Sequence, residues 1–395
     1  MTFDRDSMYR AASMYKTSMY ETSMYADQAM LGERQSAAEG EPPLKVAHIN
    51  AALIPAGIEY WLAALCHYAN PRRLQFLRTV VLTDWIDQRQ VARMGMPVEV
   101  GGRDSVVAAA AECDVLLVSD PGCNSHTVAS WINEARPPLT IFVAHGDGNY
   151  TADRMAGIGF AIDHIVAVTQ HVRRAVCDGW PVSVILNGVD PKRLTRTQPR
   201  VQCRDQLGFS PRDFVVGFVG RFSQEKRPDL LIDAVSRLPS HVKLLLVGHG
   251  HLRDQLIQRC LRELPGRFSL IEGDGDLGNL YAAMDTLVMP SQLEGYGLVA
   301  MEAMMCGVPL IATPFGMVAD LVTDGVDGLV VSLAVDSIVD AIAKLDKSPE
   351  LCRCLASGGR RLAERSGYAA TMAREYESLL WHLWGKRNPT RQRWM

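Results

Sequence analysis

The sequence lacks the features that mark membrane-spanning, secreted and nucleic-acid-binding proteins. No stretch approaches the roughly 18 consecutive apolar residues of a membrane-spanning helix, and the chain does not start with a basic segment followed by an apolar one. Lysine and arginine number 41 against 44 aspartates and glutamates, so the basic excess that favours nucleic acid is missing. The nine cysteines contain no C-x-x-C pair and suggest neither a metal knuckle nor a disulfide framework. We therefore expect a cytoplasmic protein with reduced thiols and no nucleic-acid partner.

The first part of the chain carries a short repeat. Ser-Met-Tyr begins at Ser7, Ser13, Ser18 and Ser23, and these unequal spacings fit neither a helical nor a strand period. A stretch rich in Ser, Ala, Glu, Gly and Pro follows, up to Pro43. We predict that residues 1–43 form a disordered tail, with a tyrosine-rich docking segment as the alternative.

From Leu44 onward, short apolar runs alternate with amphipathic segments of ten or more residues. Runs without polar alternation indicate strands buried on both faces, as in a parallel sheet covered by helices. A length of 395 residues with 48% hydrophobic content favours two domains. The sequence therefore predicts an α/β protein with two doubly wound, Rossmann-like domains, over residues 44–190 and 191–367, and a ligand between them at the carboxyl ends of the strands. The expected strands are Lys45–Asn50, Phe76–Thr83, Asp114–Ser119, Thr140–His145, His164–Thr169 and Ser183–Leu186 in the first domain, and Phe214–Val219, Val242–Val247, Phe268–Ile271, Thr286–Met289, Pro309–Ala312 and Leu329–Val330 in the second.

The densest motif is the 27-residue string PSQLEGYGLVAMEAMMCGVPLIATPFG, residues 290–316. A predicted strand ends at Pro290, a loop with Gly295 and Gly297 follows, and a helix is expected from Leu298. Glycines at such a turn let the backbone approach a ligand, and the free amides of a helix start favour an anion. Glu294 and Glu302 flank this turn, and their carboxylates suit hydroxyl donors such as those of a sugar and a ribose.

A second motif, GFVGRFSQEKRPDLLIDAV, places cations at a strand end. The predicted strand Phe214–Val219 runs into Gly220 and Arg221, and Lys226 follows five residues later. An arginine and a lysine at the carboxyl end of a strand are what a pyrophosphate needs for charge neutralisation. The alternative is a pair of solvated surface cations.

The stretch from Phe214 to Val331 resembles the donor-binding half of retaining GT-B glycosyltransferases of family 4, also called glycosyl transferases group 1. The resemblance implies that Arg221 and Lys226 bind the donor diphosphate, that Glu302 holds the ribose hydroxyls and that Glu294 touches the donor sugar. It also implies that the amides of Gly295, Tyr296, Gly297 and Leu298 face the phosphates and the sugar. The motifs that carry it are Gly220–Lys226, the LLLVGHG strand end at Leu244–Gly250, Glu294 and Glu302 with seven residues between them, and Ala312–Gly316.

The first domain carries weaker matches to the same family. PAGIEYWLAAL, from Pro55, resembles the family's glycine-rich loop followed by a glutamate, with Ala56 in place of one glycine, so Gly57 is expected near the donor. IFVAHGDG places His145 at a strand end, where the family has a histidine near the reacting carbon; a structural histidine is the alternative. VILNGVD matches the interdomain link, with Asn187 to Asp190 as the hinge.

The Asp-Gly-Asp triplet at residues 274–276 imitates a metal motif of another glycosyltransferase fold. In this chain it follows the predicted strand Phe268–Ile271, a position that the family uses near the nucleotide base. We therefore expect Gly273, Asp274 and Gly275 to form a turn on the base side of the nucleotide. No metal and no other cofactor are expected, because Arg221 and Lys226 would supply the positive charge.

The function expected from the resemblance is transfer of a sugar from a UDP- or GDP-linked donor to an acceptor hydroxyl, with retention at the anomeric carbon, in glycan, polysaccharide or glycoconjugate synthesis. Arg221, Lys226, Glu294 and His145 are the expected catalytic residues. A nucleotide-sugar epimerase and a catalytically silent binding partner stay open as alternatives. Residues 368–395 are expected to form a helix that returns to the first domain, while the Trp and Arg residues at the end leave contact with a membrane surface open.

Overall fold

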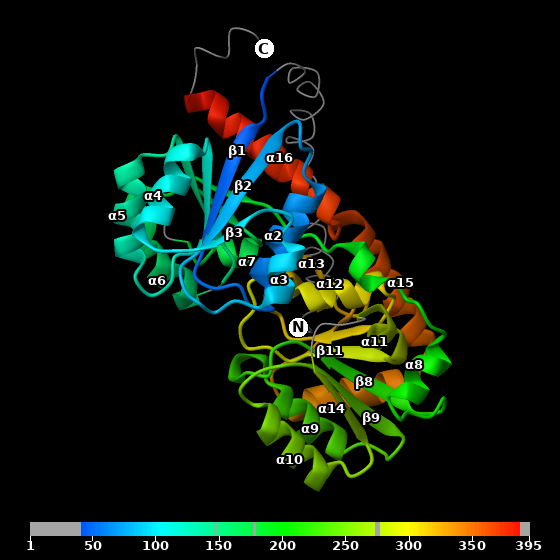
Figure 1. Cartoon of the computed structure of the whole chain (residues 1–395). Helices are drawn as coiled ribbons and strands as arrows, with labels where there is room; N and C mark the ends of the chain where they lie inside the picture. Colours follow the sequence, from blue (N-terminus) through cyan, green and yellow to red (C-terminus); the bar gives the residue numbers. More distant parts are fainter. Residues whose placement is uncertain (1–40, 147, 177–178, 273–276, 388–395) are drawn as a thin grey trace, which may run out of the picture.

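The computed structural model describes residues 41–146, 148–176, 179–272 and 277–387. The Ser-Met-Tyr repeat and the predicted base-side turn of Gly273, Asp274 and Gly275 lie outside the described residues. Two α/β units stand one above the other, each built on its own parallel sheet (Figure 1).

The sheet of the first domain has seven parallel strands in the order β3-β2-β1-β4-β5-β6-β7. Its central strands are buried on both faces: every residue of β5 is buried, as are the first five of β4. This burial explains why their sequences are continuous apolar runs without alternation. The strands are β1 (Leu44–Asn50), β2 (Leu74–Val81), β3 (Val98–Val100), β4 (Val115–Asp120), β5 (Leu139–Ala144), β6 (His164–Ala167) and β7 (Val182–Val184), and the helices between them are α2 (Gly57–Tyr68), α3 (Gln88–Arg93), α4 (Arg103–Glu112), α5 (Ser125–Ala135), α6 (Gly148–Ile158), the 3₁₀ turn η1 (Gly159–Ala161) and α7 (Gln170–Arg173).

The sheet of the second domain has six parallel strands in the order β10-β9-β8-β11-β12-β13. The strand order reverses beside β8, as it does beside β1 in the first sheet, and ligands bind at such reversal points in open α/β sheets. The strands are β8 (Phe214–Val219), β9 (Val242–Gly248), β10 (Phe268–Glu272), β11 (Thr286–Met289), β12 (Leu310–Ala312) and β13 (Leu329–Val330), and the helices are α8 (Arg200–Gln206), the 3₁₀ turn η3 (Gln224–Lys226), α9 (Pro228–Ser236), α10 (Arg253–Glu263), α11 (Leu277–Ala283), α12 (Leu298–Met305), α13 (Met317–Leu321), α14 (Val335–Asp346) and α15 (Pro349–Ser366).

All twelve strands expected from the sequence are present, and their ends shift by at most two residues. The sequence analysis missed β3, an edge strand of only three residues, Val-Glu-Val, which is too short to show a period. Helix α7 is short and ends at Arg173. The segment between the two sheets also contains secondary structure: the 3₁₀ turn η2 (Pro191–Leu194) and α8.

The chain passes between the domains twice, and the two passages touch. Val189 N donates to Gly367 O at 2.7 Å, and Ala369 N donates to Val189 O at 3.1 Å. Gly188 has no room for a side chain there, since a Cβ would lie 2.4 Å from the Cα of Ala369. The linker and the start of the last helix therefore lie side by side, joined by backbone hydrogen bonds.

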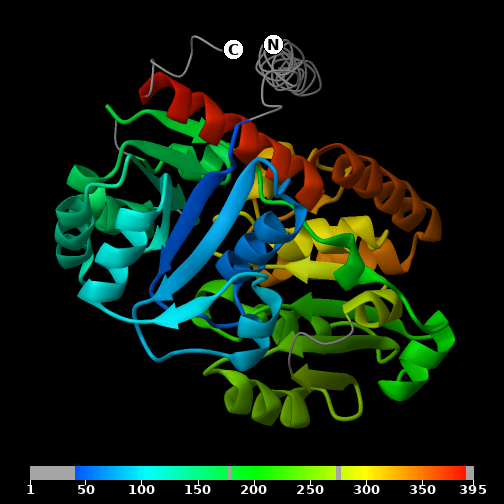
Figure 2. The same cartoon turned by 45° about the horizontal axis from the view of Figure 1, so that its top comes forward.

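The last helix, α16 (Ala369–Arg387), runs along the first domain and packs against α2 (Figures 1 and 2). Asn70 N donates to Glu377 Oε1 at 2.6 Å, and Trp381 Nε1 donates to Arg73 O at 3.2 Å. The Arg387 guanidinium pairs with Asp163 near the end of the helix. Within the described residues, no helix is both long and apolar enough to cross a membrane.

Candidate active site

The loop after β11 touches the first domain directly. A Cβ placed on Gly295 would lie 1.6 Å from the carbonyl oxygen of His145, so this backbone approach requires glycine. Thr169 Oγ1 donates to Gly295 O at 2.9 Å, and the amide of His171 donates to Asp320 Oδ2 at 2.8 Å. The carboxyl ends of β5 and β6 therefore meet the carboxyl end of β11, which is where the sequence predicts the ligand.

Lys226 and Glu294, expected to bind different parts of the donor, form an ion pair. Lys226 Nζ lies 2.7 Å from Glu294 Oε1, and the Ser291 hydroxyl donates to the same oxygen at 2.8 Å. Lys226 Nζ also donates to Leu293 O at 3.3 Å. Both side chains are largely buried, so the lysine charge stands balanced before any anion arrives.

Arg221 follows β8 and is the more open of the two predicted phosphate-binding cations. Its side chain is 48% exposed, and its guanidinium lies 3.6 Å from Glu225 Oε1. The Ser223 hydroxyl donates to that same oxygen at 2.6 Å, so Arg221 shares this carboxylate with a second partner. A long, exposed ion pair of this kind contributes little energy, and the guanidinium is free to turn toward a bound anion.

Helix α12 starts at Leu298, directly after the loop that follows β11. Gly297 has φ of 91°, a left-handed conformation that glycine adopts at no steric cost. Met317 N donates to Tyr296 O at 2.8 Å, which ties the loop to the start of α13. The first amides of α12 thus follow directly after the loop that carries Glu294, and free amides at a helix start suit a phosphate.

Glu302, the expected ribose ligand, is only 3% exposed and already has two partners. Arg193 NH1 lies 3.2 Å from its Oε1, and the Tyr281 hydroxyl donates to its Oε2 at 2.9 Å. The sequence analysis assigned no role to Arg193 or Tyr281. Nothing in the chain order points to them, because they precede Glu302 by 109 and 21 residues.

His145 lies at the end of β5, within a buried group of aromatic and hydroxyl side chains. Its ring meets the Trp61 ring edge-on, with 4.7 Å between centroids. Ser119 Oγ lies 3.5 Å from His145 Nε2 and 2.9 Å from Nε2 of the buried His48. Burial, together with the charge of His48, lowers the pKa of His145 to about 3. The imidazole is therefore neutral at physiological pH, able to donate or accept a hydrogen bond but carrying no charge.

Glu59 is a further buried carboxylate at the same place. Its Oε1 accepts a hydrogen bond from Ile54 N at 3.3 Å. Burial raises the pKa of Glu59 to about 7; the negative charge of Asp120 acts in the same direction, and the positive charge of Arg221 acts in the opposite one. Arg221 of the second domain therefore lies close enough to affect the pKa of Glu59 in the first domain. Gly57, two residues earlier, faces the other domain as well, because a Cβ there would lie 3.7 Å from Leu298 Cδ1. The sequence analysis noted a glutamate after this glycine-rich loop but assigned it no role.

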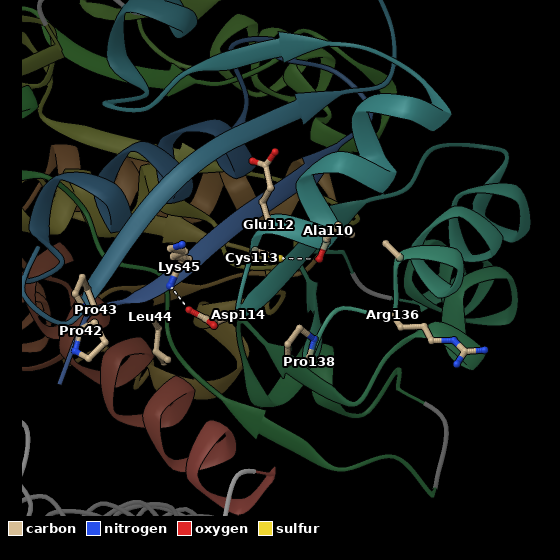
Figure 3. A pocket seen from close by; sticks show the side chains of 12 residues that line it. Pro42, Pro43, Leu44, Lys45, Ala110, Glu112, Cys113, Asp114, Arg136 and Pro138 are labelled. Atoms are coloured by element: carbon tan, nitrogen blue, oxygen red, sulfur yellow. Dashed lines mark hydrogen bonds between the residues drawn. The ribbon is translucent and has the colours of Figure 1, made fainter. Parts of the chain in front are cut away.

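The structure therefore brings Gly57, His145, Arg221, Lys226, Glu294, Glu302 and the turn from Gly295 to Leu298 to the region where the domains meet, and none of these residues falls elsewhere. Across the described part of the chain, no group of three or more His, Cys, Asp or Glu side chains is arranged to hold a metal ion. A separate hollow at the opposite end of the first sheet, beside Lys45 and Asp114, is drawn in Figure 3. It lies at the amino ends of β1 and β4, away from these residues.

Comparison with known proteins matches residues 200–362 to the family model "Glycosyl transferases group 1". The lipopolysaccharide core biosynthesis mannosyltransferase LpsB of Rhizobium meliloti (strain 1021) is 31% identical over 235 residues, which cover 55% of this chain and 66% of that protein. The D-inositol 3-phosphate glycosyltransferase of Segniliparus rotundus is 31% identical over 266 residues, covering 62% of this chain and 58% of that protein. The chain thus spans less than two thirds of the length of these relatives.

Among solved structures, Anabaena HepE in complex with UDP and glucose superposes with a TM-score of 0.76 at 23% identity. The superposition covers 85% of this chain and 99% of that one. A likeness over almost the full length of both domains establishes the GT-B fold, as the sequence predicted.

Proposed function

Because residues 200–362 match the family model "Glycosyl transferases group 1", we propose that this chain transfers a sugar from a nucleotide-sugar donor to an acceptor hydroxyl with retention at the anomeric carbon. The donor is UDP- or GDP-linked, and the reaction serves glycan or glycoconjugate synthesis in the cytoplasm. Support for the donor class comes from HepE, whose solved structures contain UDP and UDP-glucose. Two relatives named as glycosyltransferases support the reaction class.

The observation that carries the proposal is the meeting of three strand ends. Arg221 and Lys226 follow β8, the glycine turn follows β11, and His145 follows β5 of the other domain, in backbone contact with Gly295. Cations and helix-start amides on one side suit a diphosphate, and neutral or carboxylate side chains on the other suit hydroxyl groups. A donor bound here would place its sugar between the two domains.

In this arrangement, Arg221 and Lys226 stabilise the negative charge that grows on the diphosphate as the glycosidic bond breaks. The donor phosphate then takes the proton of the acceptor hydroxyl, which attacks from the face that the diphosphate leaves. Glu294, held by Lys226 and Ser291, would accept hydrogen bonds from sugar hydroxyls. His145 stays neutral beside them and contributes through hydrogen bonding.

The test begins with a thermal-shift screen of UDP- and GDP-sugars, since a ligand at a hundred times its Kd stabilises the native state by about 2.7 kcal/mol. The stabilising donor is then incubated with candidate acceptors, and the anomeric configuration of the product is determined from proton coupling constants. A product with the donor's anomeric configuration is expected, and an inverted product would contradict retention. Conversion of donor without acceptor would identify an epimerase, and absence of any turnover or donor hydrolysis would identify a silent partner.

A further inference from the structure

Arg193, in the linker between the domains, contacts both of them at once. Its guanidinium carbon lies 3.6 Å from the centroid of the Tyr60 ring, on α2 of the first domain. Its NH1 lies 3.2 Å from Oε1 of Glu302, on α12 of the second domain. Stacking on an aromatic face together with a carboxylate partner is a use for which the flat guanidinium is suited.

The backbone that carries Arg193 is held on both sides. The Tyr68 hydroxyl donates to Asp190 Oδ1 at 2.7 Å, which ties the start of η2 to α2. On the other side, a Cβ on Gly278 would lie 2.6 Å from the carbonyl oxygen of Leu194 and 2.5 Å from that of Thr195, so η2 rests directly on α11. The position of the Arg193 backbone is therefore fixed by contacts with both domains.

Glu302 is held at both oxygens and still has acceptor capacity. Arg193 occupies Oε1 and the Tyr281 hydroxyl occupies Oε2. Burial and the neighbouring Glu302 raise the pKa of Tyr281 well above its ordinary value, so the tyrosine remains a donor. A carboxylate offers about four acceptor positions, so one remains on each oxygen. Two adjacent hydroxyl groups could bind there without displacing either partner.

Arg193 also supplies the positive charge that stabilises the buried Glu302 carboxylate. A carboxylate that is 3% exposed and loses its charged partner leaves an uncompensated buried charge, which protonation, rotation or water entry must relieve. Each of these responses would remove or turn away the acceptor positions that a ribose requires.

We propose that Arg193 is a positioning residue for the nucleoside of the donor: it holds the Glu302 carboxylate so that its two remaining acceptor positions meet the 2′- and 3′-hydroxyls of the ribose. The inference rests on the proposed function, which assigns the ribose to Glu302. It adds that recognition of the ribose depends on the interdomain linker and, through Tyr60, on the first domain.

The experiment measures the binding of UDP and of 2′,3′-dideoxy-UDP by calorimetry, with GDP and its dideoxy form used if UDP does not bind. The full chain is compared with Arg193→Ala, Arg193→Lys and Glu302→Ala. Arg196→Ala is the matched control, because Arg196 is an exposed arginine of the same linker. Loss of a hydrogen bond to a charged group corresponds to roughly a tenfold to hundredfold loss of affinity.

We expect Arg193→Ala and Glu302→Ala each to weaken UDP binding by about tenfold or more while leaving the dideoxy nucleotide nearly unaffected. Arg193→Lys keeps a cation beside Glu302 and should retain most of the preference for ribose; Arg196→Ala should retain all of it. Wild-type UDP affinity in Arg193→Ala, or an equal loss for both nucleotides, would overturn the role of Arg193. If the unaltered chain binds neither UDP nor GDP, or if Glu302→Ala keeps the ribose preference, the nucleotide assignment itself is wrong.

Discussion

Lys226 Nζ and Glu294 Oε1 lie 2.7 Å apart, although the two residues belong to separate motifs 68 positions apart in the chain. The pair joins the turn after β8 to the loop after β11. The lysine charge is therefore balanced by Glu294, and Arg221 is the more exposed of the two predicted phosphate-binding cations. Glu294 in turn is held in one orientation, with its Oε1 bound to both Lys226 and Ser291.

Lys226→Met should lower turnover with the donor by about 10²–10³-fold, the usual effect of removing one charge-stabilising group. The loss should exceed any change in donor affinity, because the leaving-group charge grows during the reaction. Steady-state kinetics against donor concentration measure both quantities. Lys344→Met removes the same charge from an exposed position on α14 and should behave like the unaltered chain. Equal losses in the two variants would contradict a specific role for Lys226.

Arg221→Ala should reduce both the rate and the affinity for the donor, since its guanidinium would contact the diphosphate before and during bond cleavage. Because the side chain is half exposed, we expect an effect near the lower end of about 2–4 kcal/mol. Comparison of kcat with KM in Arg221→Ala and Glu302→Ala separates the two roles. Full recovery of Arg221→Ala at saturating donor, with Glu302→Ala inactive, would mean that the two roles are reversed.

Ser119→Ala should slow turnover by about tenfold or more, because the hydroxyl lies between the ring nitrogens of His48 and His145 and its loss removes a contact of the His145 ring. Its removal should also cost about 1–3 kcal/mol of stability, since buried ring nitrogens lose a partner. Ser183→Ala is the matched control: Ser183 Oγ lies 2.9 Å from His164 Nε2 in the same sheet, outside the candidate site. If both variants lose stability but keep equal turnover, Ser119 has only a structural role.

His164→Asn should make the protein less sensitive to acid. Burial, with smaller contributions from Lys386 and His382, lowers the pKa of His164 from 6.5 to about 4. The unfolded chain therefore binds a proton more readily than the folded one, so this contribution to stability is present above pH 6.5 and is lost as the pH falls toward 4. Glu59, whose pKa is raised, acts in the opposite direction, so the variant must be compared with the unaltered chain.

Urea unfolding at pH 7 and pH 5 measures this difference. The free energy of unfolding of His164→Asn should fall by about 1–2 kcal/mol less than that of the unaltered chain over this interval. His126→Asn, at an exposed histidine of the same domain, is the matched control. A parallel decline in all three proteins would contradict a buried, neutral His164.

The fold was predictable because its signals are local. Continuous apolar runs such as Val115–Val118 indicate a strand buried on both faces whatever surrounds it. Strand β3 was not predicted because three residues show no period. The glycine turn and the positions of Arg221 and His145 at strand ends follow from short motifs for the same reason. Since the carboxyl ends of parallel strands share one edge of a sheet, these motifs predicted which side of each domain carries the site.

The amino-acid sequence by itself determined the two doubly wound sheets, the glycine turn before α12 and the residue types at the strand ends, because each depends on neighbours within about one element. Only the tertiary structure decided the partners: Lys226 with Glu294, Arg193 with Glu302 and Tyr60, and Arg221 near enough to Glu59 to affect its pKa. These contacts join residues that lie far apart in the chain. Their geometry is set by how two domains and a linker pack together, and no periodicity or spacing in one segment records that packing.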